Sequence, residues 1–235
     1  MLMDSQPAAP VEASYSCRHC GLGAFCPPNA PQPLRSRTLR VRKGAPLYAA
    51  GDPCEEVYAV HSGAFKSVLS DADGRTVVCG FRFPGDVLGL EASALGRHAT
   101  DMIALEASDV CVVPLPRTEG ADAPQSLQRQ FTRLVAGALL DRNAAALVHA
   151  TLDSDARLAW FLATLARRFA SRGLDVARLR LPMSRVDIAA YLGLTPETVS
   201  RSFSTLQEEG LVRVSARNVE VRNLQGLEAR SREKN

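Results

Sequence analysis

The chain has 235 residues, of which 46% are hydrophobic and 23% are charged, and its formal net charge is +3. This length accommodates two compact domains, and the hydrophobic content excludes a largely disordered chain. Because the net charge is small, any affinity for nucleic acid must depend on the local placement of arginines. No apolar stretch reaches membrane-spanning length, and residues 1–15 lack the pattern of a signal peptide. We therefore expect a cytoplasmic protein with no membrane partner, in which the six cysteines stay reduced.

Residues 1–34 are expected to form an N-terminal arm with three closely spaced cysteines. The three lie in CRHCGLGAFC, with the spacing C-x2-C-x5-C, and are Cys17, Cys20 and Cys26. Gly21 and Gly23 allow the backbone to wrap around a small group. Three clustered thiols suit an iron–sulfur cluster, which takes four sulfur ligands, or a zinc site that His19 completes. The arm alone leaves the cluster, zinc and free thiols as alternatives.

Residues 35–124 are expected to form a β-barrel domain. Segments rich in β-branched and aromatic residues, such as VYAV, FKSVLS and RTVVCGFRF, alternate here with glycines. Short strands separated by regular turns are typical of a jelly-roll barrel. Asp73-Gly74 is a hairpin signal between two of these segments, and the strand pattern resumes from Ile103 to Val113.

The remaining three cysteines lie within this barrel pattern. Cys54 falls in a turn-like segment and Cys79 inside a strand, and we interpret both as small packing residues. In DVCVV, strand alternation places Cys111 on the face opposite Val110 and Val112. Cys111 therefore either packs inward or meets the N-terminal arm.

Residues 125–152 are expected to form one long helix with two apolar stripes at helical spacing. The first stripe is expected to pack on the barrel and contains Leu127, Phe131, Leu134, Ala138, Ala145 and Val148. The adjacent stripe contains Val135, Leu139, Arg142 and Ala146. Because a second stripe needs a second partner, we interpret it as the interface of a homodimer. The alternative is that Val135 and Leu139 only widen the core-facing side.

Residues 153–235 are expected to form a separate domain that contains a helix-turn-helix. A helix over 155–172 precedes the segment 181–214, which has the pattern of two short helices around a tight turn. Ser184 begins the first helix as a cap, Gly193 supplies the turn residue, and Thr195 caps the second helix. Two alternating segments after Gly210 predict a two-stranded wing.

The second short helix is expected to read double-stranded DNA. Its apolar positions face the core, which leaves on the opposite face Glu197, Ser200 and Arg201. An arginine binds the O6 and N7 atoms of guanine, a glutamate accepts from the N4 amine of cytosine, and a serine bonds several base edges. The alternative is a solvated helix face with an ordinary Glu197–Arg201 ion pair.

Together these segments resemble the CRP/FNR family of bacterial transcription regulators, in particular its oxygen-sensing FNR branch. The matching stretches are CRHCGLGAFC, GDPCEEVYAVHSGAFKS, GFRFPGDVLGL, DVCVVP and YLGLTPETVSRSF. The resemblance implies an α+β fold. Its parts are an N-terminal jelly-roll, cyclic-nucleotide-binding-like β-barrel, a long dimerisation helix and a C-terminal winged helix-turn-helix.

The resemblance also implies a cofactor. In the FNR branch, three arm cysteines and one cysteine of a later strand hold a 4Fe–4S cluster, and the corresponding residues here are Cys17, Cys20, Cys26 and Cys111. Side chains beside such ligands control access of solvent and gas, and we expect this shielding role for Gly21 and Phe25.

For the DNA-binding domain, the resemblance implies that Glu197, Ser200 and Arg201 read a TTGAT-type half-site in a palindromic promoter site. The hairpin around Gly74 resembles the loop by which such regulators contact RNA polymerase. The expected function is therefore an oxygen- or redox-responsive regulator, of the activator type, that dimerises and binds DNA when oxygen is low.

The alternative function is a small-molecule-binding CRP-like regulator whose cysteine arm holds structural zinc or no cluster. In cyclic-nucleotide-binding members an Arg-Ser or Arg-Thr pair holds the phosphate, whereas His98-Ala99 falls near that position here, with Arg97 adjacent. Cyclic-nucleotide binding therefore stays open. An enzyme is not expected, because no pairing of a nucleophile with a base is visible.

Overall fold

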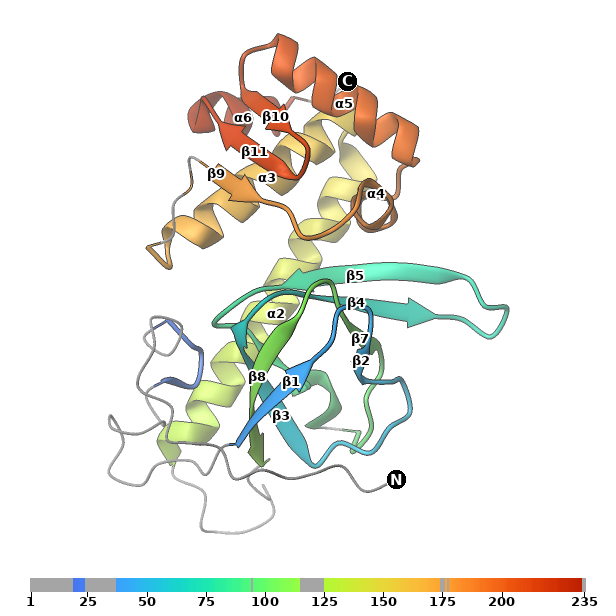
Figure 1. Cartoon of the computed structure of the whole chain (residues 1–235), viewed down its shortest axis with the longest axis vertical. Helices are drawn as coiled ribbons and strands as arrows, with labels where there is room; N and C mark the ends of the chain where they lie inside the picture. Colours follow the sequence, from blue (N-terminus) through green and yellow to red (C-terminus); the bar gives the residue numbers. More distant parts are fainter. Residues whose placement is uncertain are drawn as a thin grey trace. The chain divides into compact units, whose positions relative to one another are not determined.

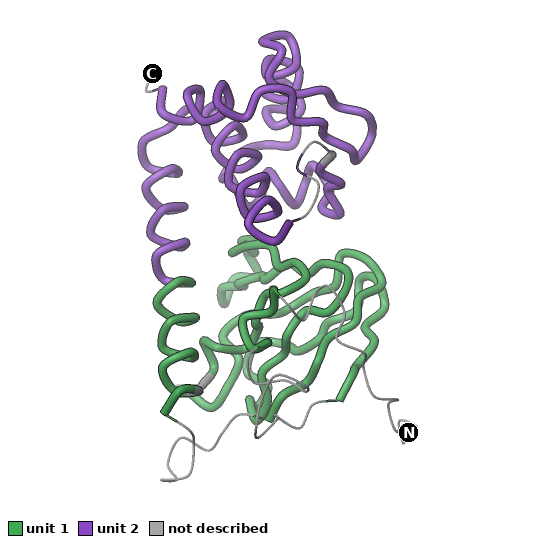
Figure 2. The backbone as a smooth tube through the Cα atoms, turned by 90° about the vertical axis from the view of Figure 1, so that its left-hand side faces the viewer, with its two compact units in different colours: residues 1–138 green, residues 139–235 purple. Residues whose placement is uncertain are grey.

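In the computed structural model, the described residues are 19–23, 37–93, 95–114, 125–173, 176 and 178–233. The chain divides into two compact units, residues 1–138 and 139–235 (Figure 2). The division falls inside the long helix α2 (Gln125–Thr151), which begins in one unit and ends in the other. The four segments expected from the sequence, 1–34, 35–124, 125–152 and 153–235, divide the chain by role, and their boundaries remain predictions.

The first unit contains two four-stranded sheets within its described part (Figure 1). One sheet has the order β1-β8-β3-β6 and contains β1 (Arg37–Val41), β8 (Ser108–Pro114), β3 (Glu56–Ser62) and β6 (Val87–Leu88). The other has the order β2-β7-β4-β5 and contains β2 (Pro46–Tyr48), β7 (Asp101–Ala104), β4 (Phe65–Ser70) and β5 (Thr76–Arg82). Neighbouring strands are antiparallel, and a short 3-10 helix, η2 (Leu90–Ser93), follows β6. This arrangement confirms the expected jelly-roll-like β-domain.

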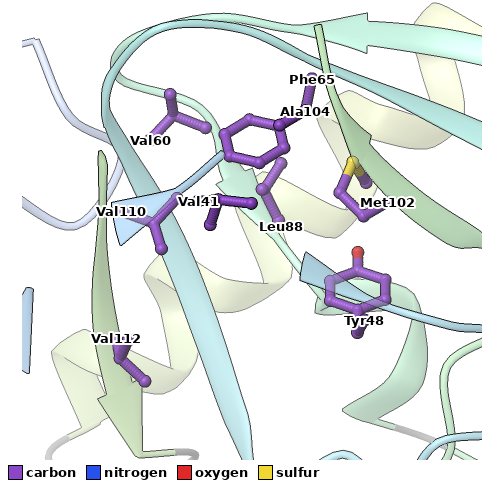
Figure 3. Close-up of a cluster of buried hydrophobic side chains, with 9 residues drawn as sticks. All are labelled: Val41, Tyr48, Val60, Phe65, Leu88, Met102, Ala104, Val110 and Val112. Atoms are coloured by element: carbon purple, nitrogen blue, oxygen red, sulfur yellow. The ribbon is translucent and has the colours of Figure 1, made fainter. Parts of the chain in front are cut away.

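The core of the first unit lies between these two sheets. Figure 3 shows its side chains converging from both sides, and they are Val41, Tyr48, Val60, Phe65, Leu88, Met102, Ala104, Val110 and Val112. Phe65 and Val110 are fully buried. Removing such side chains from water is the main favourable contribution to folding of a domain of this size.

A second apolar cluster lies on the other face of the β1-β8-β3-β6 sheet. Its buried members are Leu22, Val57, Leu90 and Val113, against which pack Cys20, Val87, Phe131 and Leu134. Phe131 and Leu134 come from the first turns of α2, so the expected contact between this helix and the barrel is present. Three of the other residues expected in that stripe differ: Ala138 is exposed, and Ala145 and Val148 belong to the second unit. The predicted stripe spans 22 residues of one helix, and the division between the two units falls within it. Its N-terminal residues therefore pack in the first unit and its C-terminal residues in the second.

The second unit contains the remaining helices and a small sheet. In chain order its elements are α3 (Ser154–Ala170), β9 (Arg178–Arg180), α4 (Arg185–Leu192), α5 (Pro196–Glu208), β10 (Val212–Ser215), β11 (Asn218–Val221) and α6 (Leu224–Arg230). The sheet order is β10-β11-β9. The predicted two-stranded wing therefore has a third strand, because Leu179 pairs with Val219 and is fully buried. No described helix combines the length and the apolar character needed to cross a lipid bilayer.

Candidate DNA-reading helix and cysteine site

The turn between α4 and α5 is fixed by local hydrogen bonds. Ser184 caps α4 through a complete capping box, in which Ser184 and Asp187 each accept from the other's backbone N–H. Gly193 ends α4 in the left-handed conformation with φ 65°, which favours glycine. Thr195 caps α5 by accepting from the Thr198 N–H at 3.2 Å, and Pro196 follows as the first helical residue. The predicted caps and turn residue are therefore present.

The α5 helix is amphipathic in the way that the sequence predicts. Its inward side chains are buried, and they are Val199, Ser202, Phe203 and Leu206. The three predicted base-reading residues are exposed on the other side, and they are Glu197, Ser200 and Arg201. This arrangement leaves the polar face of α5 available to a partner.

Local contacts already orient the reading side chains. Arg201 Nη2 donates to Thr198 Oγ1 at 3.3 Å, and the Thr198 hydroxyl lies 3.0 Å from that of Thr195. Ser200 Oγ donates to the Pro196 carbonyl at 2.9 Å, so this hydroxyl must turn away before it can donate to a base. In the described structure Arg201 is oriented by Thr198 rather than by the Glu197–Arg201 ion pair of the alternative interpretation.

Arg185 was not singled out from the sequence, although it begins α4. Its guanidinium carbon lies 3.5 Å from the centre of the Phe203 ring, which is a cation–π contact between α4 and α5. Burial lowers the pKa of Arg185. The contact packs the two helices against each other, and its signal could not be found in the sequence because it depends on their crossing.

The strands of the second unit carry further arginines that the sequence analysis did not name. Arg213 in β10 and Arg217 at the β10–β11 turn are exposed, and Arg222 is exposed just after β11, where it pairs with Glu220 at 3.0 Å. Arg217 Nη1 donates to the Pro182 carbonyl at 3.3 Å, and the Arg217 carbonyl accepts from Leu181 N–H at 2.8 Å. The turn of this wing is thereby tied to the segment just before α4. Exposed arginines beside a reading helix suit the phosphate backbone of DNA, which positions such a domain without specifying sequence.

The described part of the arm, residues 19–23, is docked on the barrel. Gly21 N–H donates to the Gly85 carbonyl at 3.0 Å, and Gln130 Nε2 donates to the Gly21 carbonyl at 2.8 Å. Leu22 is fully buried, and its N–H donates to the Cys20 sulfur at 3.4 Å. The arm segment is therefore attached both to the barrel and to α2.

A side chain at position 21 would require the neighbouring side chains of Leu134 and Val87 to shift. A Cβ there would lie 2.8 Å from Leu134 Cδ2 and 3.1 Å from Val87 Cγ2. The residue thus has a packing role that the sequence did not reveal. The expected shielding role of Gly21 remains a prediction. Phe25, the other residue expected to shield the cluster, lies outside the described residues.

Cys111 lies on the sheet face that the arm covers. In β8 it pairs with Thr38 on one side and with Ala59 on the other, and Val113, two residues on, pairs with Val57. Val57 and Val113 are buried in the same cluster as Leu22. Of the two orientations left open by the sequence, Cys111 takes the one that faces the arm.

Two of the four predicted cluster ligands, Cys17 and Cys26, lie outside the described residues. Among the described residues, no three His, Cys, Asp or Glu side chains are grouped as a metal site. The fit to a cluster therefore depends on Cys20 and Cys111. Both are thiols, the ligand type that iron–sulfur clusters require, and Cys20 accepts a backbone N–H at its sulfur, as cluster ligands do.

Of the other two cysteines, Cys54 has the packing environment expected from the sequence, whereas Cys79 is half-buried and its packing role remains a prediction. Cys54 is buried, and its thiol donates to the carbonyls of Glu56 at 3.3 Å and Gly89 at 3.8 Å. Burial raises the pKa of Cys54, which disfavours the thiolate that metals bind. The Cys79 thiol donates to the Val77 carbonyl at 3.8 Å within β5.

Aromatic side chains occupy the barrel region where the cyclic-nucleotide question arises. His98 is buried and stacks on Tyr48 with ring centres 3.6 Å apart, and the Tyr48 hydroxyl donates to Glu91 Oε1 at 3.4 Å. Burial lowers the pKa of His98, which favours its neutral form. Arg97, the alternative phosphate ligand, donates to the Gly51 carbonyl at 2.8 Å on the exposed side. His98 in its favoured neutral form presents no cation to a phosphate, whereas Arg97 is exposed and keeps its charge and its remaining N–H donors.

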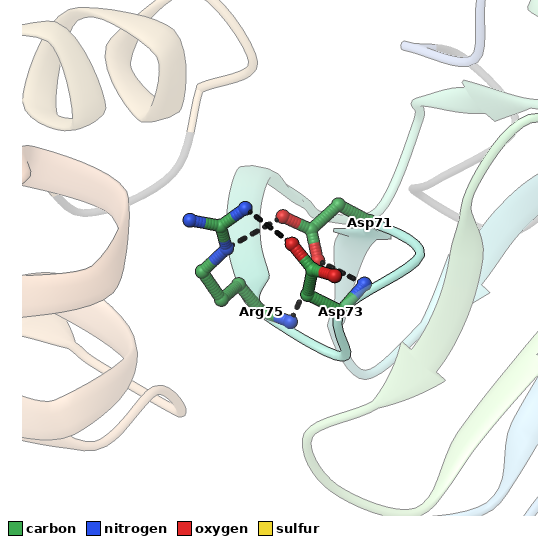
Figure 4. Close-up of polar contacts among 3 residues, drawn as sticks. All are labelled: Asp71, Asp73 and Arg75. Carbon is green, nitrogen blue, oxygen red and sulfur yellow. Dashed lines mark hydrogen bonds and ion pairs between the residues drawn. The ribbon is translucent and has the colours of Figure 1, made fainter.

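The tip of the β4–β5 hairpin is a polar turn (Figure 4). Arg75 pairs with Asp71 at 2.7 Å and with Asp73 at 2.8 Å, and Gly74 has φ 79°. The predicted hairpin turn is present at Asp73-Gly74. Its expected contact with RNA polymerase stays a prediction.

The four residues of the predicted dimer interface are all exposed on α2, and they are Val135, Leu139, Arg142 and Ala146. Val135 is 45% and Leu139 58% exposed, which contradicts the alternative that they widen the core-facing side. Leu140 and Leu147 are also exposed, at 69% and 64%. At helical spacing these two leucines lie on a different side of α2 from the predicted stripe, so α2 has exposed apolar residues on more than one side.

Two family models match the chain. Residues 156–230 match a Crp-like helix-turn-helix domain, and residues 38–120 match a cyclic nucleotide-binding domain. Over 220 residues the chain is 37% identical to the transcriptional regulatory protein Btr of Bordetella pertussis, covering 90% of this chain and 91% of that protein. It is 32% identical over 220 residues to the fumarate and nitrate reduction regulatory protein of Escherichia coli, covering 90% of this chain and 88% of that protein.

Solved structures agree with these matches. The structure of FixK2 from Bradyrhizobium japonicum superposes with a TM-score of 0.77 at 32% identity and covers 85% of this chain and 99% of that one. A CRP/FNR-family regulator from Thermus thermophilus has a TM-score of 0.65 at 21% identity, covers 85% of this chain and all of that one, and shares the fold.

Proposed function

The chain belongs to the CRP/FNR family of DNA-binding transcription regulators, and from this premise we propose that it responds to oxygen or redox state through a 4Fe–4S cluster. Its ligands are Cys17, Cys20, Cys26 and Cys111. In this proposal the protein binds a TTGAT-type inverted repeat as a homodimer under low oxygen. It acts in the cytoplasm as a regulator, without enzymatic activity.

One observation carries the cluster proposal: the arm segment with Cys20 docks on the sheet face that presents Cys111. The two cysteines are 91 positions apart in the chain, yet Leu22 and Val113, each two residues from one of them, lie in one buried cluster. A cysteine with only a packing role would not need this pairing. The 32% identity to the fumarate and nitrate reduction regulatory protein of E. coli supports the proposed branch of the family.

When bound, a 4Fe–4S cluster supplies a redox-active centre held by four thiolates. The chain's own contribution is to hold the arm in place. Gln130 of α2 donates to the Gly21 carbonyl at 2.8 Å, and Leu134 packs against the group of buried apolar side chains that contains Leu22. The arm, the barrel and the beginning of the long helix are thereby joined at one place. A change in the arm is expected to reach α2 directly through these contacts.

The reading mechanism follows from the exposed face of α5. Glu197, Ser200 and Arg201 lie within the first turns of this helix, the part that enters the major groove in helix-turn-helix proteins. Arginine to guanine and glutamate to cytosine give base discrimination. Two such helices in a two-fold dimer read the two halves of a palindrome, which is why the exposed face of α2 is part of the proposal.

RNA polymerase is the further partner in this proposal, and its contact surface is the tip of the β4–β5 hairpin. Leu69 and Val77 pair across this hairpin and remain 48% and 55% exposed. The polar tip at Asp71, Asp73 and Arg75 extends beyond them. Exposed apolar side chains next to an ordered polar turn are suited to contact with another protein.

Purification without oxygen, followed by an absorption spectrum, tests the proposed function. A cluster protein is straw-brown and loses its colour in air, whereas a structural zinc protein is colourless. DNA binding to a TTGAT repeat is then measured before and after exposure to air. Colour that bleaches together with a loss of DNA binding supports the proposal. A colourless protein that contains zinc and binds DNA equally in both conditions favours the alternative, a CRP-like regulator that binds a small molecule.

A further inference from the structure

A single arginine joins the end of the long helix to the turn of the helix-turn-helix. Arg157 of α3 donates from Nε to the Leu152 carbonyl at 2.9 Å and from Nη2 to the His149 carbonyl at 2.7 Å. From Nη1 it donates to the Leu192 carbonyl at 3.1 Å. All three acceptors are backbone groups. His149 belongs to the last turn of α2 and Leu152 follows it, whereas Leu192 is the last residue of α4.

These carbonyls need partners, because the last carbonyls of a helix have no backbone N–H donor within the helix. They also carry the partial negative charge of the helix C-terminus, which favours a cation. The guanidinium group is planar and holds its donors in a fixed fork, so three bonds from one group fix three pieces of backbone relative to one another. Arg157 thereby fixes the end of α2 relative to the α4–α5 turn.

Neighbouring contacts strengthen the junction between the end of α2, the beginning of α3 and the α4–α5 turn, which we call the joint. His149 meets Tyr191 edge-on with ring centres 6.1 Å apart, and Tyr191 also lies 5.7 Å from the Phe161 ring. Asp153 caps α3 immediately after the end of α2. The break between the two helices, only Leu152 and Asp153, is therefore bonded on both sides.

The α6 helix holds the same joint from another direction. Arg230 lies 3.7 Å from Asp153, 3.5 Å from Asp155 and 3.6 Å from Glu209, the residue that caps the end of α5. Arg230 is only 17% exposed at its side chain. The N-terminus of α3 is thus linked to the reading helix at its C-terminal end, while Arg157 links it to the turn at the other end.

We propose that Arg157 is the positioning residue that sets the orientation of the reading helix α5 relative to the C-terminal part of α2. This inference rests on the proposed function, in which two α2 helices pair and two α5 helices read two half-sites. Arg157 itself contacts no base. It determines instead which separation and rotation of the half-sites a dimer accepts.

The tests use the full chain, prepared without oxygen, and a series of DNA duplexes. Each duplex carries two TTGAT half-sites whose spacing is the one that the wild type binds best, one base pair shorter or one base pair longer, and a further duplex carries one half-site only. One base pair changes the relative rotation of the half-sites by roughly 35°. Affinities are measured by fluorescence anisotropy for the wild type and for Arg157→Ala, Arg157→Lys and Arg167→Ala.

The wild type is expected to favour its best spacing by about tenfold or more, and the Arg157 variants by about threefold or less, because a loosened joint accepts rotated half-sites. Arg157→Lys keeps the charge but lacks the fork, so it should resemble Arg157→Ala. Arg167→Ala is the matched control: it removes an arginine of the same helix whose Nε bonds Glu228 Oε1 at 2.7 Å and not α2. It should keep the wild-type preference.

Two outcomes would overturn the inference. In the first, the Arg157 variants keep the wild-type preference for spacing. In the second, they lose affinity by one common factor on every duplex, including the single half-site, which indicates only a weakened fold. Arg157→Lys keeps the test valid if Arg157→Ala does not fold. A wild type that binds no TTGAT repeat at any spacing would instead contradict the proposed function.

Discussion

Cys111 lies on the same face of strand β8 as Val113, and that face is covered by the arm through Leu22. The opposite face of β8 carries Val110 and Val112, which belong to the core between the two sheets. The alternation of side chains along β8 therefore decides on which face of the sheet Cys111 lies. It lies on the face covered by the arm segment 19–23 rather than on the face of the core between the two sheets.

Replacing each cysteine by serine separates ligands from packing residues. Cys17→Ser, Cys20→Ser, Cys26→Ser and Cys111→Ser should each lose most of the iron and the DNA binding measured without oxygen, because a 4Fe–4S cluster needs four thiolates. Cys54→Ser and Cys79→Ser should keep both. Iron analysis of the six variants checks this. Full iron in Cys111→Ser, or its loss in Cys54→Ser, would contradict the ligand assignment.

Truncating Leu22 tests whether arm docking supports the cluster. Leu22 is fully buried, so Leu22→Ala should cost about 2–5 kcal/mol of arm-docking free energy. The variant should therefore take up less iron and expose the arm to protease, although all six cysteines remain. Leu95→Ala is the control, because Leu95 is 72% exposed. Equal iron content and equal protease resistance in both variants would show that Leu22 does not hold the arm.

The expected shielding of the cluster is tested at Phe25. After anaerobic reconstitution, Phe25→Ala should lose its colour in air faster than the parent protein, because a bulky side chain beside a ligand restricts access to the metal. The bleaching rate is followed by absorption. Gly21→Ala serves as comparison, since its effect is expected through contact with Leu134. Equal rates for Phe25→Ala and the parent would remove the shielding role.

Much of this architecture follows from local sequence signals. The capping of α4 by Ser184, the left-handed Gly193 and the cap at Thr195 depend on neighbouring residues, so the helix-turn-helix could be predicted. The contacts of Arg157 and Arg185 could not, because they depend on how helices distant in sequence cross. The same limit explains β9, which becomes a strand only by pairing with β11. Apolar periodicity also showed that α2 has two apolar sides, but it did not show that two units share one of them.

Base reading by α5 is tested at Arg201 and Glu197. Arg201→Ala and Glu197→Ala should each cost about 1–3 kcal/mol at the cognate site and relax the preference at one base pair. Binding to all single-base variants of a TTGAT repeat measures both effects. Arg213→Ala is the matched control on the wing, and it should weaken all sequences alike if it contacts phosphate. A uniform loss of affinity for Arg201→Ala would make Arg201 a backbone contact.

The turn of the helix-turn-helix is tested by stability. Gly193→Ala should lower the free energy of unfolding by about 1–2 kcal/mol, because a side chain is strained at φ 65°. Ser184→Ala should cost about 1 kcal/mol through loss of the cap. Thermal unfolding measures both. Gly137→Ala is the control, since a Cβ on Gly137 inside α2 would meet nothing within 4 Å beyond the adjoining helix itself, and alanine there should stabilise the helix.

The proposed dimer face of α2, the stripe Val135, Leu139, Arg142 and Ala146, has one charged member, Arg142. Two-fold pairing of the stripe with Val135, Leu139 and Ala146 would bring two guanidinium groups together, and like charges that lose solvent oppose association. We expect the cluster-free wild type to be largely monomeric for this reason. Arg142→Leu or Arg142→Ala should dimerise without a cluster and bind DNA in air. A shift of a few kcal/mol is sufficient to change which state predominates.

Sedimentation of the cluster-free proteins measures this directly, and Arg133→Leu is the control. Arg133 is exposed on the same helix, nine residues before Arg142, and so lies about two and a half turns away on the opposite side. Arg133→Leu makes the same change of charge and of apolar surface as Arg142→Leu, but it should not promote the dimer. A wild type that already forms a tight dimer, or an Arg142→Leu variant that stays monomeric, would show that this charge does not control assembly.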